Sequence, residues 1–304
     1  MVVRIFLSLL FTFIYLNAEF NLTKLDQYHE NICHALIDGS NRLDSYLMDT
    51  NSTESTTEAE IKTSYAIENG RESEYTMRLR LRLSLPYLQN KFRIVLEDED
   101  SNDPLYDGTN LDNEYKAENK NYFLGVQYFD YMIQRHHVSS ALGVRFRKST
   151  IQPYVNFKVE YLIEENEEYT SQVTDRLRLY SNGDIENIFT YNILEPFQDE
   201  FYVLIDNVHR YQNWEEDRTI SNSIAVMKLL DDQRVASLGV GLLSRYNRDE
   251  IKIVYPQLYG VYHAPLYKDW IYYELSPSLL WREENNYAPS ARFMVNIGTL
   301  FKTY

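Results

Sequence analysis

Apolar and polar residues alternate with a period of two through most of this chain. The clearest stretch, residues 75–85, reads YTMRLRLRLSL, with an apolar side chain at every odd position and a polar one at every even position. In a β-strand, this period places all the apolar side chains on one face. The eleven residues of this stretch match the roughly 9–11 residues of a tilted strand that crosses a bilayer.

Similar segments recur from residue 59 onward, and they predict fourteen strands, with twelve as the nearest alternative count. The strands are expected near residues 59–68, 74–85, 91–97, 121–129, 138–147, 153–162, 172–180, 185–194, 200–210, 219–229, 235–245, 251–262, 270–282 and 291–301. Turn residues such as Asn69-Gly70 separate neighbouring segments. Pro153, Pro256 and Pro277 fall inside expected strands, and because proline lacks a ladder donor we expect bulges or shortened strands there.

The first 58 residues follow other patterns. Residues 1–18 combine Arg4, the apolar stretch Ile5–Leu16 and the small residue Ala18, which together predict a secretory signal peptide. In residues 19–48, apolar residues recur mostly at three- and four-residue steps, which predicts an amphipathic helix. Residues 49–58 are polar without an apolar period and predict a linker.

The helix has two open interpretations. In one it is periplasmic and packs on the rim of the strand domain or on itself; in the other it is a plug inside that domain. Its apolar face includes Leu25, His29, Ile32 and Leu36, and Cys33 lies near this face as a small buried group. The strand domain then spans residues 59–301, and residues 302–304 form a short tail.

Three features favour lipid contact for the apolar strand faces. A signal peptide directs the chain out of the cytoplasm. An even number of antiparallel strands removes every sheet edge by closing into a barrel. Aromatic residues cluster at segment ends, as in the girdles at membrane interfaces; these are Tyr75, Tyr87, Tyr161, Trp270, Trp281 and Phe301. The fold class expected is therefore all-β, an antiparallel transmembrane β-barrel preceded by a short helix.

Composition narrows the functional classes. The formal net charge of −15 argues against nucleic acid as a partner, because polyanions favour basic surfaces. The single cysteine permits no internal disulfide. Beyond residue 18 no run of 18 apolar residues occurs, so the sequence predicts no transmembrane helix after the signal peptide.

The final strand reads RFMVNIGTLF and resembles the C-terminal strand of Gram-negative outer-membrane barrels, which ends on an aromatic residue. Phe293, Val295, Ile297 and Phe301 share its apolar face. The stretches LYDGTNLDNEYKAENKNYFL and WIYYELSPSLLW are similar to uncharacterised outer-membrane proteins of ε-proteobacteria. These resemblances imply the outer membrane as the location, with the N-terminal segment in the periplasm. The implied partners are outer-membrane lipid, lipopolysaccharide and the barrel-assembly machinery.

If the apolar faces meet lipid, the polar faces enclose a lumen. Nine basic residues share these faces: Arg78, Arg80, Arg82, Arg93, Arg145, Arg147, Lys158, Arg176 and Arg178. The acids expected to point inward are Glu97, Glu160 and Glu274. A basic wall would concentrate anionic solutes. Alternatively, Arg–Glu pairs fill and brace the lumen, because each buried charge needs a partner.

No enzymatic constellation is found. Ser181-Asn182-Gly183 resembles the Ser-Asn-Gly of outer-membrane phospholipase A, whose catalytic histidine stands two residues before the serine; that position holds Leu179 here. We therefore interpret the segment as a hairpin turn. The pair His136-His137 is not expected to bind a metal from a strand, since neighbouring strand residues face opposite ways. We expect the pair in a short periplasmic connection. Neither a metal site nor a cofactor is predicted.

The function expected from the sequence is a passive outer-membrane channel for small polar or anionic solutes. The first alternative is a non-conducting structural or binding barrel whose lumen is filled by Arg and Glu. A second alternative resembles the fatty-acid transporter barrels, which carry an N-terminal hatch, but the arginine-rich strands argue against an apolar path. A hydrolase is disfavoured because the activating base is missing.

Overall fold

The structure is a computed structural model that describes residues 22–48, 57–84, 93–98, 121–133, 135–147, 150–165, 170–198, 200–214, 218–231, 233–247 and 250–302. The expected signal peptide and most of the expected linker lie outside these residues. Within the strands, the side chains of Arg93, Glu97 and Arg147 are also outside the described part.

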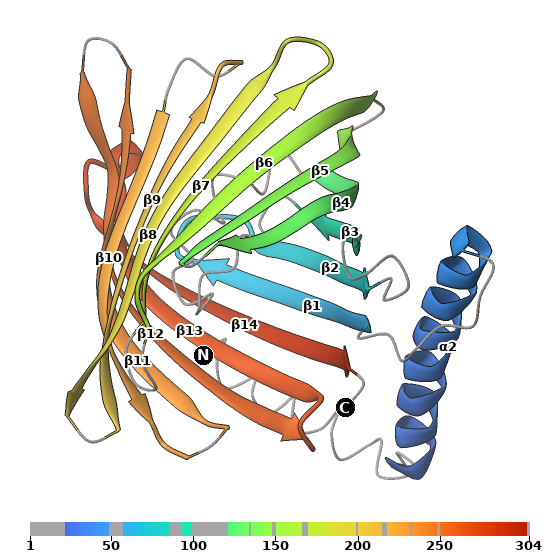
Figure 1. Cartoon of the computed structure of the whole chain (residues 1–304). Helices are drawn as coiled ribbons and strands as arrows, with labels where there is room; N and C mark the ends of the chain where they lie inside the picture. Colours follow the sequence, from blue (N-terminus) through green and yellow to red (C-terminus); the bar gives the residue numbers. More distant parts are fainter. Residues whose placement is uncertain are drawn as a thin grey trace.

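Fourteen antiparallel strands form one closed barrel in sequence order, and β1 pairs with β14 to complete it (Figure 1). The strands are β1 (Thr57–Glu68), β2 (Glu74–Ser84), β3 (Arg93–Asp98), β4 (Asn121–Ile133), β5 (His136–Arg147), β6 (Thr150–Glu165), β7 (Thr170–Tyr180), β8 (Ile185–Gln198), β9 (Phe201–Gln212), β10 (Arg218–Leu229), β11 (Val235–Tyr246), β12 (Ile251–Tyr267), β13 (Ile271–Trp281) and β14 (Pro289–Lys302). The predicted strand count, order and closure are confirmed. We call the end at which β1 begins and β14 ends the terminal end, and the opposite end the distal end.

The polarity of the wall is that of a membrane barrel, with polar side chains inside and apolar ones outside. Along β1, Lys62, Ser64 and Glu68 point inward and are buried, whereas Ile67 on the other face is exposed. On β5, Leu142 is 62% exposed and Arg145 is completely buried. A soluble barrel would show the reverse pattern, because its apolar faces form the core.

Inward glycines allow tyrosine rings to lie flat against the wall. The space that a Cβ would take at Gly298 is filled by the Tyr272 ring, and Tyr154 lies in the same way over Gly143. These close contacts keep bulky inward side chains near the wall instead of across the lumen.

The prolines differ in their effects. Pro153 lies in the uninterrupted 16-residue β6 and its pairing with Val144 is regular, so the expected bulge there is wrong. The register of β11 and β12 shifts at Val254, two residues before Pro256. The β12–β13 ladder is interrupted opposite Pro277. Further shifts lie at Pro196 and Pro265, which the sequence analysis did not single out.

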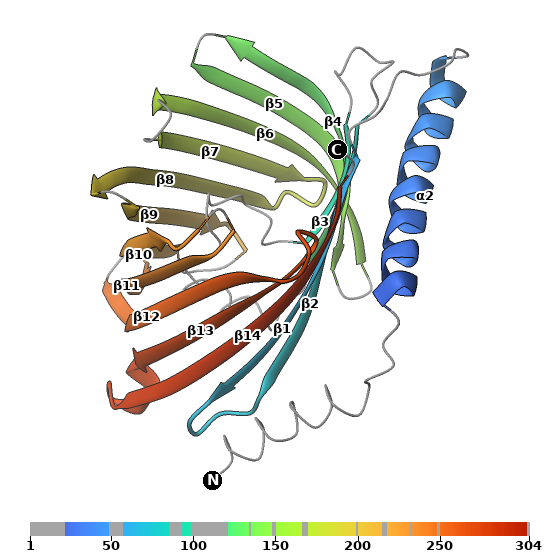
Figure 2. The same ribbon diagram turned by 90° about the horizontal axis from the view of Figure 1, so that it is seen from below.

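The helix α2 (Leu22–Met48) lies outside the barrel, against the terminal ends of β14, β1 and β2 (Figures 1 and 2). His29 stacks on Trp270 and Phe301, with ring centroids 4.2 and 5.3 Å apart, and its Nε2 lies 2.9 Å from the carbonyl oxygen of Leu300. Asp26 accepts a hydrogen bond from the Tyr267 hydroxyl (3.1 Å). These contacts are with the outer wall and the β12–β13 turn, so they favour packing at the rim over a plug in the lumen.

Docking of α2 changes the surroundings of several residues. Phe301 and Trp270 are buried, although both were expected at the lipid interface. On the helix, Ile32 is exposed, because the docked face runs through Leu25, His29 and Cys33. The described helix is not long and apolar enough to be a candidate membrane span.

Candidate functional site in the barrel lumen

The most deeply buried charges of the lumen form a network near the distal end, between β7 and β8. Arg178 Nη1 donates to Glu186 Oε2 at 2.9 Å, and the exposed fractions of the two side chains are 4% and 1%. Gln212 Nε2 and the Tyr180 hydroxyl also donate to this carboxylate, at 2.8 and 3.3 Å. The Arg178 guanidinium lies 4.0 Å from the Phe123 ring centroid. The pair is thus both hydrogen-bonded and packed, as a buried ion pair requires.

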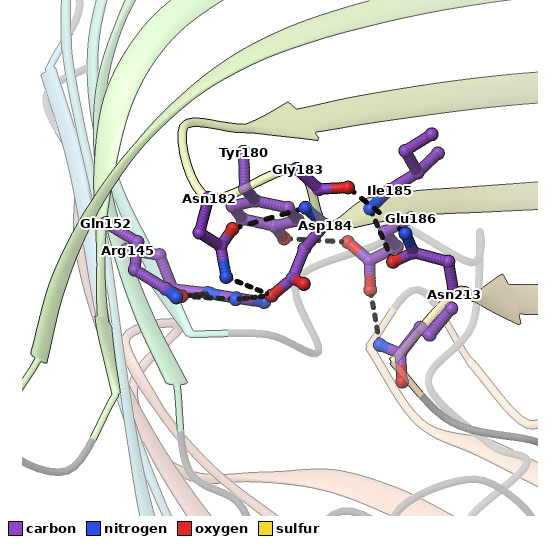
Figure 3. A network of polar contacts seen from close by, with 10 residues as sticks. Arg145, Gln152, Tyr180, Asn182, Gly183, Asp184, Ile185, Glu186 and Asn213 are labelled. Carbon is purple, nitrogen blue, oxygen red and sulfur yellow. Dashed lines mark hydrogen bonds and ion pairs between the residues drawn. The ribbon is translucent and has the colours of Figure 1, made fainter.

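A second buried arginine joins this network from β5 (Figure 3). Arg145 donates from Nε to Gln152 Oε1 at 2.8 Å, and its Nη2 lies 3.3 Å from Asp184 Oδ2. Its guanidinium also lies over the rings of Tyr180 and Trp214, at 3.7 and 4.8 Å from their centroids. Cation–π contacts of this kind are strongest where water is excluded.

The turn that carries Asp184 is built from local hydrogen bonds. Asn182 Nδ2 donates to Asp184 Oδ2 at 2.8 Å, and the Asp184 amide donates to Asn182 Oδ1 at 3.2 Å. Gly183 takes a positive φ of 88°, which suits glycine. The interpretation of Ser181–Asp184 as a hairpin turn is confirmed, because β7 ends at Tyr180 and β8 begins at Ile185.

Across the lumen, a second network ties β1 to β13 and β14, also near the distal end. Arg282 binds Glu68 with both Nε and Nη2, each at 2.8 Å. Arg292 bridges two carboxylates, with Nη1 3.5 Å from Glu68 and Nη2 3.0 Å from Glu74. Nearer the terminal end, Lys62 Nζ lies 3.0 Å from Glu274 Oε2, and Asn296 donates to the same carboxylate.

The charged side chains on β2 and β6, and His137 at the start of β5, are more open. Arg80 is 29% exposed and lies 3.8 Å from Glu60, while Lys158 is 30% exposed and contacts Glu160 at 2.5 Å. His137 also contacts Glu160. These residues lie towards the terminal end of their strands. The lumen is therefore packed at the distal end and partly open along β2, β5 and β6 at the terminal end.

The residues of the predicted basic wall fall into a buried group and a partly exposed group. Arg145, Arg176 and Arg178 are buried in the lumen, whereas the other described members keep partial exposure: Arg78, Arg80, Arg82 and Lys158. Glu160 and Glu274 point inward as expected, and each contacts a lysine. Of the C-terminal strand residues, Phe293 and Ile297 are exposed outward and Val295 is half-buried between them, while α2 covers Phe301.

Sequence reasoning missed several members of the networks. Glu68, Glu186 and Arg292 are buried on inward faces, and the alternation of their strands was the available signal. The histidine pair was placed wrongly: His136 and His137 begin β5 instead of forming a connection. β4 and β5 stay paired as far as Ile133 and His136, so both histidines belong to the strand. Their rings face opposite sides of the wall, as the period of two requires.

The lumen also holds apolar clusters that the alternation did not predict. Leu243, Tyr255 and Leu280 form one cluster on β11–β13, and Leu204 packs with Tyr259 and Val261 in another. Both lie on inward faces, which were expected to be polar throughout. These clusters reduce the space inside the barrel that water and ions can occupy.

No family model matches the chain, and no curated protein matches it. Its fold is similar to those of several solved bacterial outer-membrane proteins. The bacterial polysaccharide outer membrane secretin is 12% identical, with a TM-score of 0.46, and the match covers 82% of this chain and 98% of that one. A loop-deletion mutant of OmpT from Vibrio cholerae is 8% identical, with a TM-score of 0.47 and coverage of 80% and 98%. The KdgM porin is 9% identical, with a TM-score of 0.37 and coverage of 79% and 98%.

Proposed function

We propose that this protein is an outer-membrane channel that passes small anionic solutes along the basic residues of β2 and β6. The observation that carries the proposal is the contrast within the lumen. Charged side chains on β2 and β6 are about one-third exposed, as at Arg80 and Lys158, whereas Arg178 and Glu186 are almost fully buried. Among the described residues, the more exposed lumen charges lie along β2 and β6, and the proposed water-filled path follows them.

The membrane location rests on the inverted polarity of the wall. Large apolar side chains such as Leu142, Ile151 and Leu238, each more than half exposed, face outward from the barrel. In water such a surface would drive aggregation, but in a bilayer it is the surface that lipid chains cover. The closed hydrogen-bonded ladder leaves no strand edge in the hydrocarbon region.

The preference for anions follows from the charges along the open side. Among the described side chains of β2 and β6, the inward cations Arg78, Arg80, Arg82 and Lys158 outnumber the inward carboxylates Glu74 and Glu160. Successive inward arginines on β2 lie about 6.6–6.8 Å apart along the strand. The resulting field favours anions and is screened by salt, with a Debye length of about 10 Å at 0.1 M.

Reversal potentials across planar bilayers, measured with purified protein in a low-salt KCl gradient, test this proposal. We expect discrete conductance steps and chloride preference, which the double substitution Arg78→Glu and Arg80→Glu reduces. The control is Lys24→Glu with Arg42→Glu, which changes the net charge equally but at exposed positions of α2, outside the barrel. Cation preference in the unchanged protein, or equal effects of both double variants, would contradict the proposed path.

A second candidate is a non-conducting barrel, and the buried ion-paired networks favour it. Arg178–Glu186 on one side and Arg282–Glu68 on the other brace the distal end with contacts of 2.8–2.9 Å. If these networks close the lumen, no conductance steps are expected from correctly folded protein. Steps that appear only after Glu68→Gln or Glu186→Gln would identify the networks as the barrier.

A further inference from the structure

The outer wall is apolar almost everywhere, but β7–β10 carry a group of polar side chains that point outward. This outer polar patch consists of Asp175 on β7, Asn187 on β8, Asn207 on β9 and Asn222 on β10. The outward direction follows from the alternation, because Arg176, Glu186, Asp206 and Ser221 next to them are buried on the inward face.

Three of these residues lie in the middle of their strands. Asp175 is five residues from the distal end of β7, Asn207 five from that of β9 and Asn222 four from that of β10. With a rise of about 3.3 Å per residue and a tilt of roughly 40°, this places them about 10–13 Å from the strand ends. The apolar band of such barrels is about 25 Å tall, so these residues lie near its centre.

Apolar side chains on the same face surround the patch, and they confirm that it lies within the apolar band. Leu179 follows Asp175 on β7, Phe189 follows Asn187 on β8, and Ile224 follows Asn222 on β10; all three are exposed. On other walls the mid-strand outward positions are apolar, as at Val138 and Leu142 on β5 or Leu238 and Val240 on β11, or carry a hydroxyl, as at Ser140. The patch is thus confined to one sector of the wall.

The hydrogen bonds within the chain satisfy only part of the patch. Asn187 Nδ2 donates to Asp175 Oδ1 at 2.7 Å and to the Arg176 carbonyl oxygen at 3.3 Å. Asn207 Nδ2 reaches the Tyr191 carbonyl oxygen only at 3.5 Å. The Asn222 amide has no hydrogen-bond partner among the described residues, although Asn222 and Asn207 are cross-strand neighbours. In hydrocarbon, unpaired amides at this depth are costly.

We infer that β7–β10 form an interface with a second copy of this chain and are not covered by lipid. All copies insert in the same orientation, so an interface about an axis normal to the membrane brings each patch to the depth of its counterpart. An amide is both a donor and an acceptor, which makes the Asn207–Asn222 pair complementary to itself. The site also lies across the barrel from α2, so the helix does not obstruct it (Figure 1).

Thiol cross-linking of the full-length protein in outer membranes tests this interface. In a Cys33→Ser background, which removes the single native cysteine, we expect Asn207→Cys and Asn222→Cys to give covalent dimers with a short bismaleimide. Leu258→Cys is the matched control, because Leu258 is also outward and exposed but lies on the apolar β12. Its dimer yield should be at least tenfold lower.

A second measurement follows the native assembly without new cysteines. The mass of the purified protein in detergent should be that of an oligomer, and Asn207→Leu with Asn222→Leu should reduce the oligomer fraction at least tenfold while the barrel stays folded by its far-UV spectrum. A monomeric mass together with equal cross-linking at Asn222→Cys and Leu258→Cys would overturn the inference. Cross-linking to a different protein would overturn the second copy as the occupant.

Discussion

Replacement of Glu186 by glutamine tests whether the distal network is truly dry. The carboxylate is 1% exposed and faces Arg178 Nη1 at 2.9 Å. Removal of one partner from a buried ion pair costs about 3–5 kcal/mol, because the other charge stays buried without compensation. Glutamine keeps the volume and can still accept from Gln212 and Tyr180, and Phe123 still faces the guanidinium. We therefore expect the low end of that range, about 3 kcal/mol.

Urea unfolding of the barrel in detergent or lipid, followed by tryptophan fluorescence, measures this loss from the midpoint and slope. Trp214 packs on Tyr180 with ring centroids 5.6 Å apart, so it reports on this part of the lumen. The control is Glu250→Gln, whose carboxylate lies 3.0 Å from Lys252 while both side chains are about half exposed. An exposed pair of this geometry contributes about 0–1 kcal/mol.

The double variant Glu186→Gln with Arg178→Met should cost less than the sum of the two single variants by about 0.5–3 kcal/mol, because it removes both charges. A loss below about 1 kcal/mol for Glu186→Gln, equal to that of the control, would refute the reasoning. Water would then reach the pair, and the lumen would be open at the distal end.

Three further predictions concern the wall, its packing and the helix. Leu142→Arg, at an outward mid-strand position that is 62% exposed, should lower folding stability in lipid bilayers by about 2–4 kcal/mol, whereas Ile251→Arg at a strand end should cost about 0–1 kcal/mol. Gly298→Ala should destabilise by about 1–3 kcal/mol because its Cβ overlaps the Tyr272 ring; Gly260→Ala meets only ordinary contacts at 3.5 and 3.6 Å and should show little change in the same urea titration. The hydrogen bond from Lys268 holds the pKa of Asp26 below its usual value of 3.8. The contact between Asp26 and Lys268 therefore stabilises docking of α2 fully above pH 3.8, and this stabilisation is lost as the pH falls through the depressed pKa. Protease protection of α2 should be constant near neutral pH, fall in acid, and lose this dependence in Asp26→Asn.

Alternation predicted the fourteen strands and which side chains share a face, while the direction of each face also needed the signal peptide, the even strand count and the aromatic positions. It succeeded because a strand in a membrane wall has two different solvents on its two faces, which forces the period of two. Residues such as Lys62, Glu68 and Glu186 alternate as clearly as the arginines, but their partners come from strands up to 214 positions away. No local pattern encodes such pairings.

The helix shows a different limit. Its period predicted an amphipathic face, but not the surface against which that face would pack. His29 finds Trp270 and Phe301, which are separated from it by most of the chain. The apolar clusters around Leu243 and Leu204 escaped notice for a related reason, because inward apolar residues on several strands contact one another only after closure.

The position of α2 has a consequence for the order in which the barrel is completed. The pairing of β1 with β14 joins Glu58 to Lys302 and is the last seam of a meander to close, since it spans almost the whole barrel sequence. The helix precedes β1 in the chain and packs on Phe301 of β14. It therefore contacts the barrel on both sides of the β1–β14 seam. Its complete docking surface, which includes β1 and β2 as well as β14, exists only after the seam has closed, so part of its contacts is absent from any transition state in which the seam is still open. Interactions formed after the transition state slow unfolding without speeding folding. The docked helix therefore lengthens the lifetime of the closed barrel.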